Sequence, residues 1–166
     1  MGNYFVKQEK TLVIIRGLPG SGKTTMANNI KNSKPLGYAM IISLDDYFTH
    51  DNYYIFDPRK LNDAHIFTQK RTEEAMKDNI NMIILDNNNV RMWECKIYVN
   101  LALKYGYQIV ILETDTPWRF DTEILLEKTN KASNIKYMNR LKRRWEEDFT
   151  VENILKSKEP WNMKET

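Results

Sequence analysis

The stretch GLPGSGKTT, residues 17–25, has residue types at a spacing that can hold phosphate groups. Gly17 and Gly22 are separated by four residues, and Lys23 and Thr24 follow directly. In this pattern the glycines let backbone N–H groups point at phosphate oxygens, the lysine reaches the β- and γ-phosphates, and the hydroxyl ligates magnesium. A chance glycine-rich turn is the alternative. The context favours the phosphate site, because a predicted strand precedes the pattern and a predicted helix opens at Lys23.

We therefore predict a site for ATP with Mg²⁺. The predicted phosphate-binding residues are Gly17, Leu18, Pro19, Gly20, Ser21, Gly22, Lys23, Thr24 and Thr25.

Two adjacent carboxylates, Asp45 and Asp46, follow a predicted strand at residues 38–43. An ionised aspartate can orient an incoming hydroxyl and take its proton during phosphoryl transfer. Neighbouring side chains that leave a strand point apart, so one acid should face the site and the other should bind structure. We predict Asp45 as the general base. An Asx-turn or a helix cap is the alternative role for the pair.

Asp86 closes the hydrophobic run MIILD, as in a Walker B strand, where the acid holds magnesium directly or through water. The alternative is a loop cap helped by residues 87–89, which are all asparagine. We predict Thr24 and Asp86 as the residues that hold the metal.

The elements that position these residues follow from hydrophobic periodicity. Apolar runs predict four strands, at residues 11–17, 38–43, 81–86 and 107–114. Helical patterns lie at residues 23–32, 58–77, 91–106, 121–130 and 134–148, with a last turn at 150–155. Asp57 is the predicted cap of the second helix, and Gly106 should end the third, with Trp93, Ile97 and Leu101 on one apolar stripe. Residues 49–56 read as an irregular aromatic loop.

Strands that alternate with helices predict an α/β fold with a parallel sheet. The near-continuous apolar runs are typical of strands covered on both faces. We expect the P-loop NTPase fold, a doubly wound parallel sheet of about four strands with flanking helices and a helical lid, in a single domain over residues 1–166. The core should span about residues 11–155 and the polar tail residues 156–166, which we expect to fray. The carboxyl ends of the strands form the functional crevice of such a sheet, so the phosphate loop, Asp45 and Asp86 should meet there.

Composition excludes several classes of protein. The chain has 166 residues, 42% of them hydrophobic, and a net charge of +3, which does not by itself require nucleic acid. One cysteine allows no intrachain disulfide and fits a reducing compartment. The N-terminal stretch lacks the apolar core of a signal peptide, and no apolar run is long enough to span a membrane. We expect a cytoplasmic protein, with the nucleus also open, and no membrane partner.

Five motifs occur in order, namely RGLPGSGKTT, LDDYF, FDPRKLNDAHIFTQKR, ILDNNNV and TDTPW. Together they resemble the polynucleotide kinase domain of the NEDD-four-binding protein two and two-like family, which is related to the phage-type 5′-hydroxyl polynucleotide kinases. The resemblance covers about residues 11–155. It implies phosphorylation of a 5′-hydroxyl on DNA or RNA, single-stranded or at an exposed end, with ATP and magnesium.

The resemblance also implies roles for particular residues. Asp45 would be the general base, and Asp86 would belong to the site. His65, Gln69 and Arg71 would line the acceptor side, with Arg71 catalytic. A packed or solvated helix face is the alternative for these three residues.

Two departures from the family pattern concern guanidinium groups. Relatives carry an arginine-rich lid after TPW, but this chain has LLEKTNKAS, where Lys128 is the predicted ATP contact and Lys131 follows. Lysine lacks the planar fork of arginine. The next helix offers substitutes or a solvated face, at Arg140, Arg143 and Arg144. The phage-type enzyme also has an arginine where this chain, like the NEDD-four-binding relatives, has a phenylalanine, Phe48.

The sequence leaves open how the acceptor is bound and which reaction is catalysed. Aromatic residues near the acids could stack on bases or pack into a small core of their own: Tyr47, Phe48, Tyr53, Tyr54 and Phe56. A kinase for a small molecule such as a nucleoside or sugar would use the same loop and aspartate. An ATP-binding module with little or no catalysis is the third possibility. Oligomeric state is open.

Overall fold

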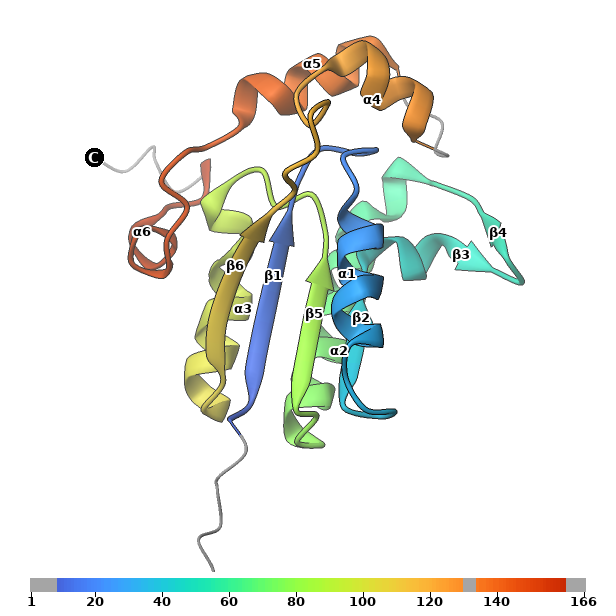
Figure 1. The fold of residues 1–166 in the computed structure, drawn as a ribbon. Helices are drawn as coiled ribbons and strands as arrows, with labels where there is room; N and C mark the ends of the chain where they lie inside the picture. The colour runs from blue at the N-terminus through green and yellow to red at the C-terminus, as the bar shows by residue number, and fades with distance from the viewer. Residues whose placement is uncertain (1–8, 130–133, 161–166) are drawn as a thin grey trace, which may run out of the picture.

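A parallel sheet of four strands forms the centre of the protein, in the order β2-β5-β1-β6 (Figure 1). The strands are β1 (Thr11–Arg16), β2 (Ala39–Ile42), β5 (Met82–Asp86) and β6 (Gln108–Glu113). All three pairings are parallel, and Ile15 at the end of β1 lies opposite Asp86. The computed structural model describes residues 9–129 and 134–160. The predicted parallel sheet is confirmed.

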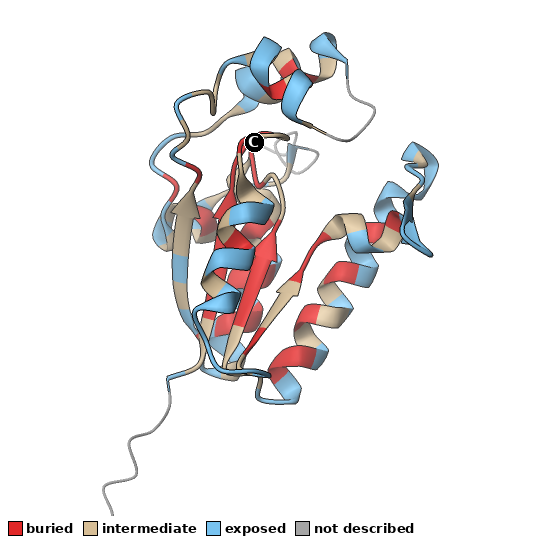
Figure 2. Cartoon of the chain, turned by 45° about the vertical axis from the view of Figure 1, so that its right-hand side comes forward, coloured by how far each residue is buried: buried red, intermediate tan, exposed pale blue. Residues whose placement is uncertain are grey.

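Helices cover the two faces of the sheet unequally. α1 (Lys23–Asn32) packs on one face, where Ala27 contacts a cluster that includes Val13 and Ile15. α2 (Leu61–Lys77), α3 (Met92–Tyr105) and α6 (Val151–Lys156) pack on the other face around a larger cluster (Figure 1). Figure 2 shows buried residues along the strands and along one side of α2. The predicted doubly wound arrangement is confirmed.

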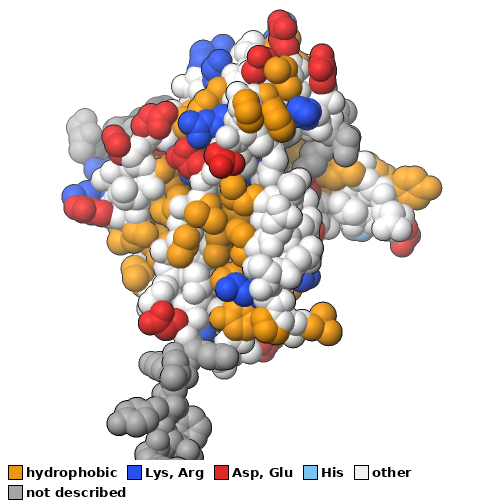
Figure 3. Space-filling model, in the orientation of Figure 1, with side chains coloured by type: hydrophobic (Ala, Val, Ile, Leu, Met, Phe, Trp, Pro, Cys, Tyr) orange, Lys and Arg blue, Asp and Glu red, His pale blue; other side chains and the backbone are white. Residues whose placement is uncertain are grey.

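One face of β6 departs from the prediction that every strand is covered on both faces. Along β6, Gln108 and Val110 are exposed, and no residue of the strand is fully buried. Figure 3 shows hydrophobic side chains gathered on the sheet face beside α1. Among the described elements, α1 is the helix that packs on this face of the sheet. β6 is the edge strand farthest from α1 in Figure 1, so this face of β6 stays exposed.

Two helices lie above the carboxyl ends of the strands (Figure 1). They are α4 (Thr122–Lys128) and α5 (Ile135–Arg144), and we call them the lid. Leu125 of α4 and Met138 of α5 are fully buried in a small cluster with Leu18 of the phosphate loop. The lid is therefore packed directly on the loop that it would cover.

The segment after β2 is more ordered than the predicted irregular loop. It contains a 3-10 helix η1 (Leu44–Phe48), a hairpin of β3 (Thr49–His50) and β4 (Tyr53–Tyr54), and a turn η2 (Pro58–Lys60) that leads into α2. Asp51 and Asn52 form the hairpin turn with φ values of +48° and +69°, which short polar side chains tolerate. The Asp57 carboxylate accepts from the Arg59 N–H at 3.0 Å, as the predicted cap.

The buried face of α3 agrees with the predicted stripe at Leu101, which is 9% exposed, but not at Ile97, which is 40% exposed. Cys95, Tyr98, Val99 and Ala102 are also buried against the sheet. These four residues also recur at helical spacing, but two of them are small, so the large apolar residues gave a misleading signal. Gly106, with φ of +72°, ends the helix as predicted.

Within residues 9–129 and 134–160, no helix is long and apolar enough to cross a membrane. Most of the predicted frayed tail, residues 161–166, lies outside the described residues. That the chain forms one domain stays a prediction.

Candidate active site

The phosphate loop, residues 17–25, joins β1 to α1 and needs its glycines. Gly20 and Gly22 have φ values of +81° and +102°, in the left-handed region that favours glycine. A Cβ atom at Gly20 would lie 2.5 Å from the Leu125 carbonyl oxygen of the lid, and one at Gly17 would lie 2.4 Å from Ser21 Oγ. Glycine at these positions therefore lets the loop curl and lets the lid approach it.

The segment TDTPW after β6 braces the phosphate loop from outside. Thr114 donates to Ser21 Oγ at 3.0 Å, and Thr116 donates to the Ser21 carbonyl oxygen at 2.8 Å. The Trp118 indole N–H donates to the Gly20 carbonyl oxygen at 3.1 Å. These bonds hold the loop through its carbonyl and hydroxyl groups and use none of its N–H groups. The motif was visible in the sequence, but its contact with the loop was not.

Thr24 and Asp86 meet as the sequence predicts. The Thr24 hydroxyl donates to Asp86 Oδ2 at 2.8 Å, and Asp86 is 7% exposed at the end of β5. A hydroxyl and a carboxylate beside a phosphate loop are the oxygen donors that Mg²⁺ takes together with phosphate oxygens. Among the described residues no group of three His, Cys, Asp or Glu could hold a metal ion.

Asp45 and Asp46 have separate environments. Ser43 caps η1, and Asp46 closes the capping box by accepting from the Ser43 N–H at 3.2 Å. Asp46 also forms an ion pair of 2.7 Å with Arg71. Asp45 instead lines the large cleft, which has a volume of about 1350 Å³. One acid thus serves the local structure and the other lines the cleft, although both lie in the 3-10 helix η1 and not at the end of a strand.

Asp45 has a tyrosine neighbour that the sequence did not single out for this role. Burial raises the pKa of Tyr54, and the charge of Asp45 and a hydrogen bond with its carboxylate raise it further. The Tyr54 hydroxyl therefore stays protonated at neutral pH and can donate to Asp45. Leu44, beside Asp45, donates its backbone N–H to Asn87 Oδ1 at 2.8 Å, which ties η1 to the end of β5.

The predicted acceptor-side residues on α2 do not stay together. His65 lines the cleft, and desolvation lowers its pKa, which favours the neutral imidazole. Gln69 and Arg71 are not among the described residues that line it. Arg71 binds Asp46 instead, and its guanidinium carbon lies 5.6 Å from the Phe67 ring centroid. A catalytic role for Arg71 stays a prediction, and in the structure this residue forms an ion pair with Asp46 of η1.

The lid brings cations to the cleft from both helices. Lys128 lines the cleft with its ammonium 4.1 Å from the centroid of the Trp118 ring. Lys136, Arg140 and Arg143 of α5 line it too. Arg144 is not among the cleft-lining residues described, and Lys131 lies outside the described residues. Two guanidinium groups of α5 are therefore available to the cleft, although the stretch LLEKTNKAS has no arginine.

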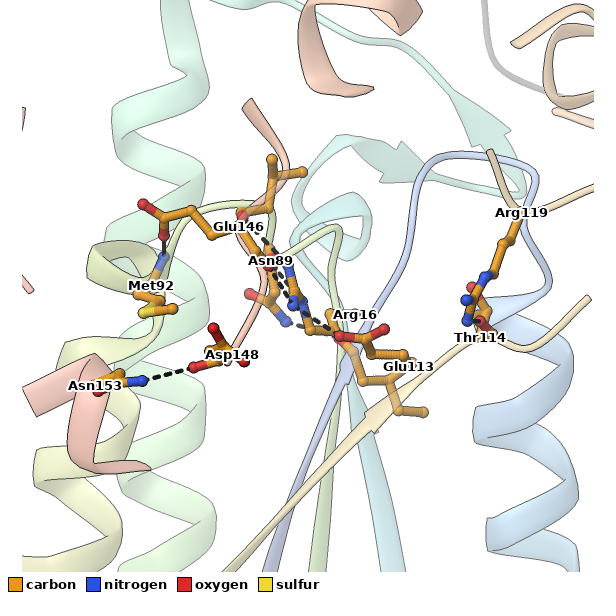
Figure 4. Close-up of polar contacts among 11 residues, drawn as sticks. Arg16, Asn89, Met92, Glu113, Thr114, Arg119, Glu146, Asp148 and Asn153 are labelled. Atoms are coloured by element: carbon orange, nitrogen blue, oxygen red, sulfur yellow. Dashed lines mark hydrogen bonds and ion pairs between the residues drawn. The ribbon is translucent and has the colours of Figure 1, made fainter. Parts of the chain in front are cut away.

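Arg16, the last residue of β1, is fully buried beside the phosphate loop. Its guanidinium donates to Glu113 Oε1 at 2.9 Å, to the Glu146 carbonyl oxygen at 2.9 Å and to the Asn89 carbonyl oxygen at 3.1 Å (Figure 4). Its guanidinium carbon lies 3.7 Å from the ring centroids of both Trp145 and Phe149. Arg16 thereby joins β1, β6, the loop after β5 and the segment after α5. In the sequence, Arg16 stands out as a cation at the end of an apolar strand, but the sequence does not show which residues it contacts.

Comparison with known proteins identifies the family. Residues 12–146 match the family described as an AAA domain, and the chain belongs to that family. With the phosphate loop, the Thr24–Asp86 pair and the lid, it is a P-loop kinase-like domain of α/β architecture.

Two relatives show what the chain resembles. It is 36% identical over 149 residues to NEDD4-binding protein 2 of Homo sapiens, a match that covers 90% of this chain and 8% of that protein. It is 31% identical over 144 residues to 2′,3′-cyclic-nucleotide 3′-phosphodiesterase of Rattus norvegicus, covering 84% of this chain and 32% of that protein. The chain thus spans less than two thirds of either relative. The predicted relationship to NEDD4-binding protein 2 is confirmed.

Solved structures confirm the fold. A chain of the Pnkp1/Rnl/Hen1 RNA repair complex superposes with a TM-score of 0.63 at 18% sequence identity, over 87% of this chain and 46% of that chain. A second structure of a Pnkp1/Rnl/Hen1 complex gives a TM-score of 0.56 over 79% of this chain and 43% of that chain. At this identity the match supports the P-loop NTPase fold alone.

Proposed function

We propose that the chain is an ATP-dependent kinase that transfers the γ-phosphate of ATP to a 5′-hydroxyl of a polynucleotide, DNA or RNA. The observation that carries the proposal is the cleft itself, in which the phosphate loop, the Thr24–Asp86 pair and Asp45 all take part. A phosphate loop and a carboxylate that lines the same cleft are what transfer to a hydroxyl requires. The RNA repair complex named above and the polynucleotide kinase resemblance favour a polynucleotide acceptor.

The reaction would divide its tasks among the residues of the cleft. The loop N–H groups and Lys23 bind the β- and γ-phosphates. Mg²⁺, held through Thr24 and Asp86, would neutralise charge on the phosphates. Lys128, Arg140 and Arg143 reach the cleft from the lid, where they can brace the γ-phosphate.

Asp45 would act on the acceptor. Its carboxylate accepts the proton of the 5′-hydroxyl while that oxygen forms a bond to the γ-phosphorus. The bond between the γ-phosphorus and the bridging oxygen breaks, and ADP leaves. The Tyr54 hydroxyl, hydrogen-bonded to Asp45, would hold the carboxylate in place. Because ATP is the donor, we propose that the protein works in the cytoplasm or the nucleus.

The test is label transfer from [γ-³²P]ATP with Mg²⁺ to 5′-hydroxyl DNA and RNA oligonucleotides, beside a panel of nucleosides and sugars. We expect label on oligonucleotide ends. Asp45→Asn should lower kcat by about 10²- to 10⁴-fold and leave ATP binding intact. Asp46→Asn is the matched control, because this acid binds Arg71 and the η1 cap and should affect kcat far less.

Other outcomes would replace the proposal. Label confined to a small molecule would identify a nucleoside or sugar kinase. Bound ATP without transfer to any acceptor would identify an ATP-binding module. Equal losses in Asp45→Asn and Asp46→Asn would remove the general-base assignment.

A further inference from the structure

An exposed apolar surface continues outward from the cleft beside Asp45. We call it the apolar ledge, and it consists of Tyr53, Ile55, Phe56 and Leu61, which are 73%, 67%, 48% and 37% exposed. Phe56 and Leu61 line the cleft together with Asp45 and Tyr54. The ledge comes from the β3–β4 hairpin and the start of α2, and Figure 3 shows hydrophobic side chains on the segment that projects there.

The ledge rests on a buried ring. Phe48 is 3% exposed, and its ring centroid lies 5.0 Å from that of Phe56 and 6.3 Å from that of Tyr54. The Ile55 N–H donates to the Phe48 carbonyl oxygen at 2.9 Å. In this aromatic segment Phe48 is therefore buried, whereas Tyr53, Ile55 and Phe56 are exposed to solvent.

The same cleft has cations on the lid side. Lys136, Arg140 and Arg143 are exposed residues of α5 that line it. The acids that line the cleft are Asp45, Asp86 and Glu94, and burial raises the pKa of Glu94. A cleft with aromatic and apolar groups on one wall and cations on another fits a single-stranded nucleic acid, whose bases stack on rings while its phosphates approach the cations.

We propose that the apolar ledge is a subsite for unpaired bases of the acceptor strand, next to the 5′ end that reacts at Asp45. The proposal rests on the proposed function and adds the form of the acceptor that it takes. A hydroxyl at Asp45 on a longer strand brings the following nucleotides past Phe56. Bases within a duplex are already stacked and paired, so the ledge selects single-stranded or unpaired 5′ ends. A small acceptor would reach Asp45 without contacting Tyr53 or Ile55.

The experiment compares acceptors of different length with wild type, Phe56→Ala, Tyr53→Ala and Leu36→Ala. Acceptors are a nucleoside 3′-phosphate, single-stranded 5′-hydroxyl oligonucleotides of increasing length, and the same sequence in a blunt duplex. Leu36→Ala is the matched control, because Leu36 is fully exposed in the turn before β2, at the opposite end of the sheet from the cleft. KM for acceptor, KM for ATP and kcat are measured for each pair.

Phe56→Ala should raise KM for single-stranded oligonucleotides by about five- to tenfold, as loss of one stacked base does. KM for the nucleoside 3′-phosphate, KM for ATP and kcat should stay within about twofold. Tyr53→Ala should act only on the longer strands, and Leu36→Ala should change nothing. Wild type should prefer the single strand to the blunt duplex.

Two results would overturn the subsite while leaving the kinase in place. One is an unchanged oligonucleotide KM in Phe56→Ala and Tyr53→Ala, as expected if the ledge binds a protein instead. The other is an equal rise for the mononucleotide and the oligonucleotides. If wild type labels no oligonucleotide, the proposed function fails, and fluorescence anisotropy of a labelled single strand then decides the subsite. Binding that weakens in Phe56→Ala supports it, and absence of binding removes it.

Discussion

The hydroxyl of Thr24 and the carboxylate of Asp86 are joined by a hydrogen bond of 2.8 Å between Oγ1 and Oδ2. Thr24 lies at the start of α1 and Asp86 at the end of β5, so the bond connects the phosphate loop to the strand beside it. The two oxygens are ligand types for Mg²⁺, and their contact shows that the chain alone already brings them together.

Removing the charge at this pair should weaken the use of magnesium. Asp86→Asn keeps the shape of the side chain but loses its negative charge, so the Mg²⁺ concentration for half-maximal ATP turnover should rise by about tenfold or more. A magnesium titration of the transfer rate measures this change. Thr24→Ser keeps the hydroxyl and should behave like wild type. An unchanged magnesium requirement in Asp86→Asn would place the ion elsewhere.

The bond from Trp118 to the phosphate loop should matter for nucleotide binding. Trp118→Phe keeps an aromatic ring but removes the N–H that donates to the Gly20 carbonyl oxygen. The loss of one hydrogen bond, about 1 kcal/mol, should weaken ADP binding by about fivefold in calorimetry. Trp93→Phe on α3, outside the cleft, is the control and should bind ADP normally. Equal ADP affinities in the two variants would show that the hydrogen bond from Trp118 to Gly20 does not contribute to nucleotide binding.

Arg16 should contribute strongly to stability. Arg16→Met leaves Glu113 and the Glu146 and Asn89 carbonyl oxygens without their donor, so the free energy of unfolding should fall by about 3–5 kcal/mol. Glu113→Gln changes the partner whose side chain is 35% exposed and should cost about 1 kcal/mol or less. Urea unfolding at constant m-value separates the two. Similar losses would mean that the ion pair, rather than the buried guanidinium, carries the effect.

Glu94 should make stability depend on pH. Burial raises the pKa of Glu94 above its usual value of 4.5, opposed by the Arg91 and Val90 N–H groups and the Arg91 charge and aided by Glu146. As pH rises above 4.5, the unfolded carboxyl ionises first, so wild type loses stability until the folded pKa is passed.

Glu94→Gln removes this titration and keeps an oxygen for the Arg91 N–H. The stability of the variant minus that of wild type should therefore increase from about pH 4.5 upward and then level off. Urea unfolding at several pH values gives the difference curve, in which the titrations common to both proteins cancel. A flat difference would show that Glu94 titrates normally.

Local patterns were sufficient for the four strands of the central sheet and for most of the helices. α1 has the predicted bounds, because a strand, a glycine loop and a helix follow one another in sequence. Asp45 lines the cleft and Asp46 binds Arg71, so the predicted division of the two acids holds although they lie in a 3-10 helix. Thr24 and Asp86 meet because parallel strands end at the same edge of the sheet.

The remaining features depend on contacts between distant segments. The rings around Arg16 belong to Trp145 and Phe149, and the brace of Ser21 comes from Thr114 and Thr116. No periodicity relates such positions. The predicted stripe of α3 includes the buried Leu101 but not Cys95 and Ala102, because these residues are small and give a weak apolar signal. The hairpin was missed because each of its strands has two residues.

The position of β1 in the sheet has a consequence for folding during synthesis. β1 pairs with β5 and β6, so Thr11 lies beside Met82 and Gln108, and β2 is not its neighbour. When β1, α1 and β2 have left the ribosome, neither partner of β1 has been made. The apolar residues of β1 therefore stay unpaired in the nascent chain until β5 and β6 have been made. Contacts between residues so far apart in sequence make folding slow. We expect the nascent chain to depend on chaperones until β6 is complete.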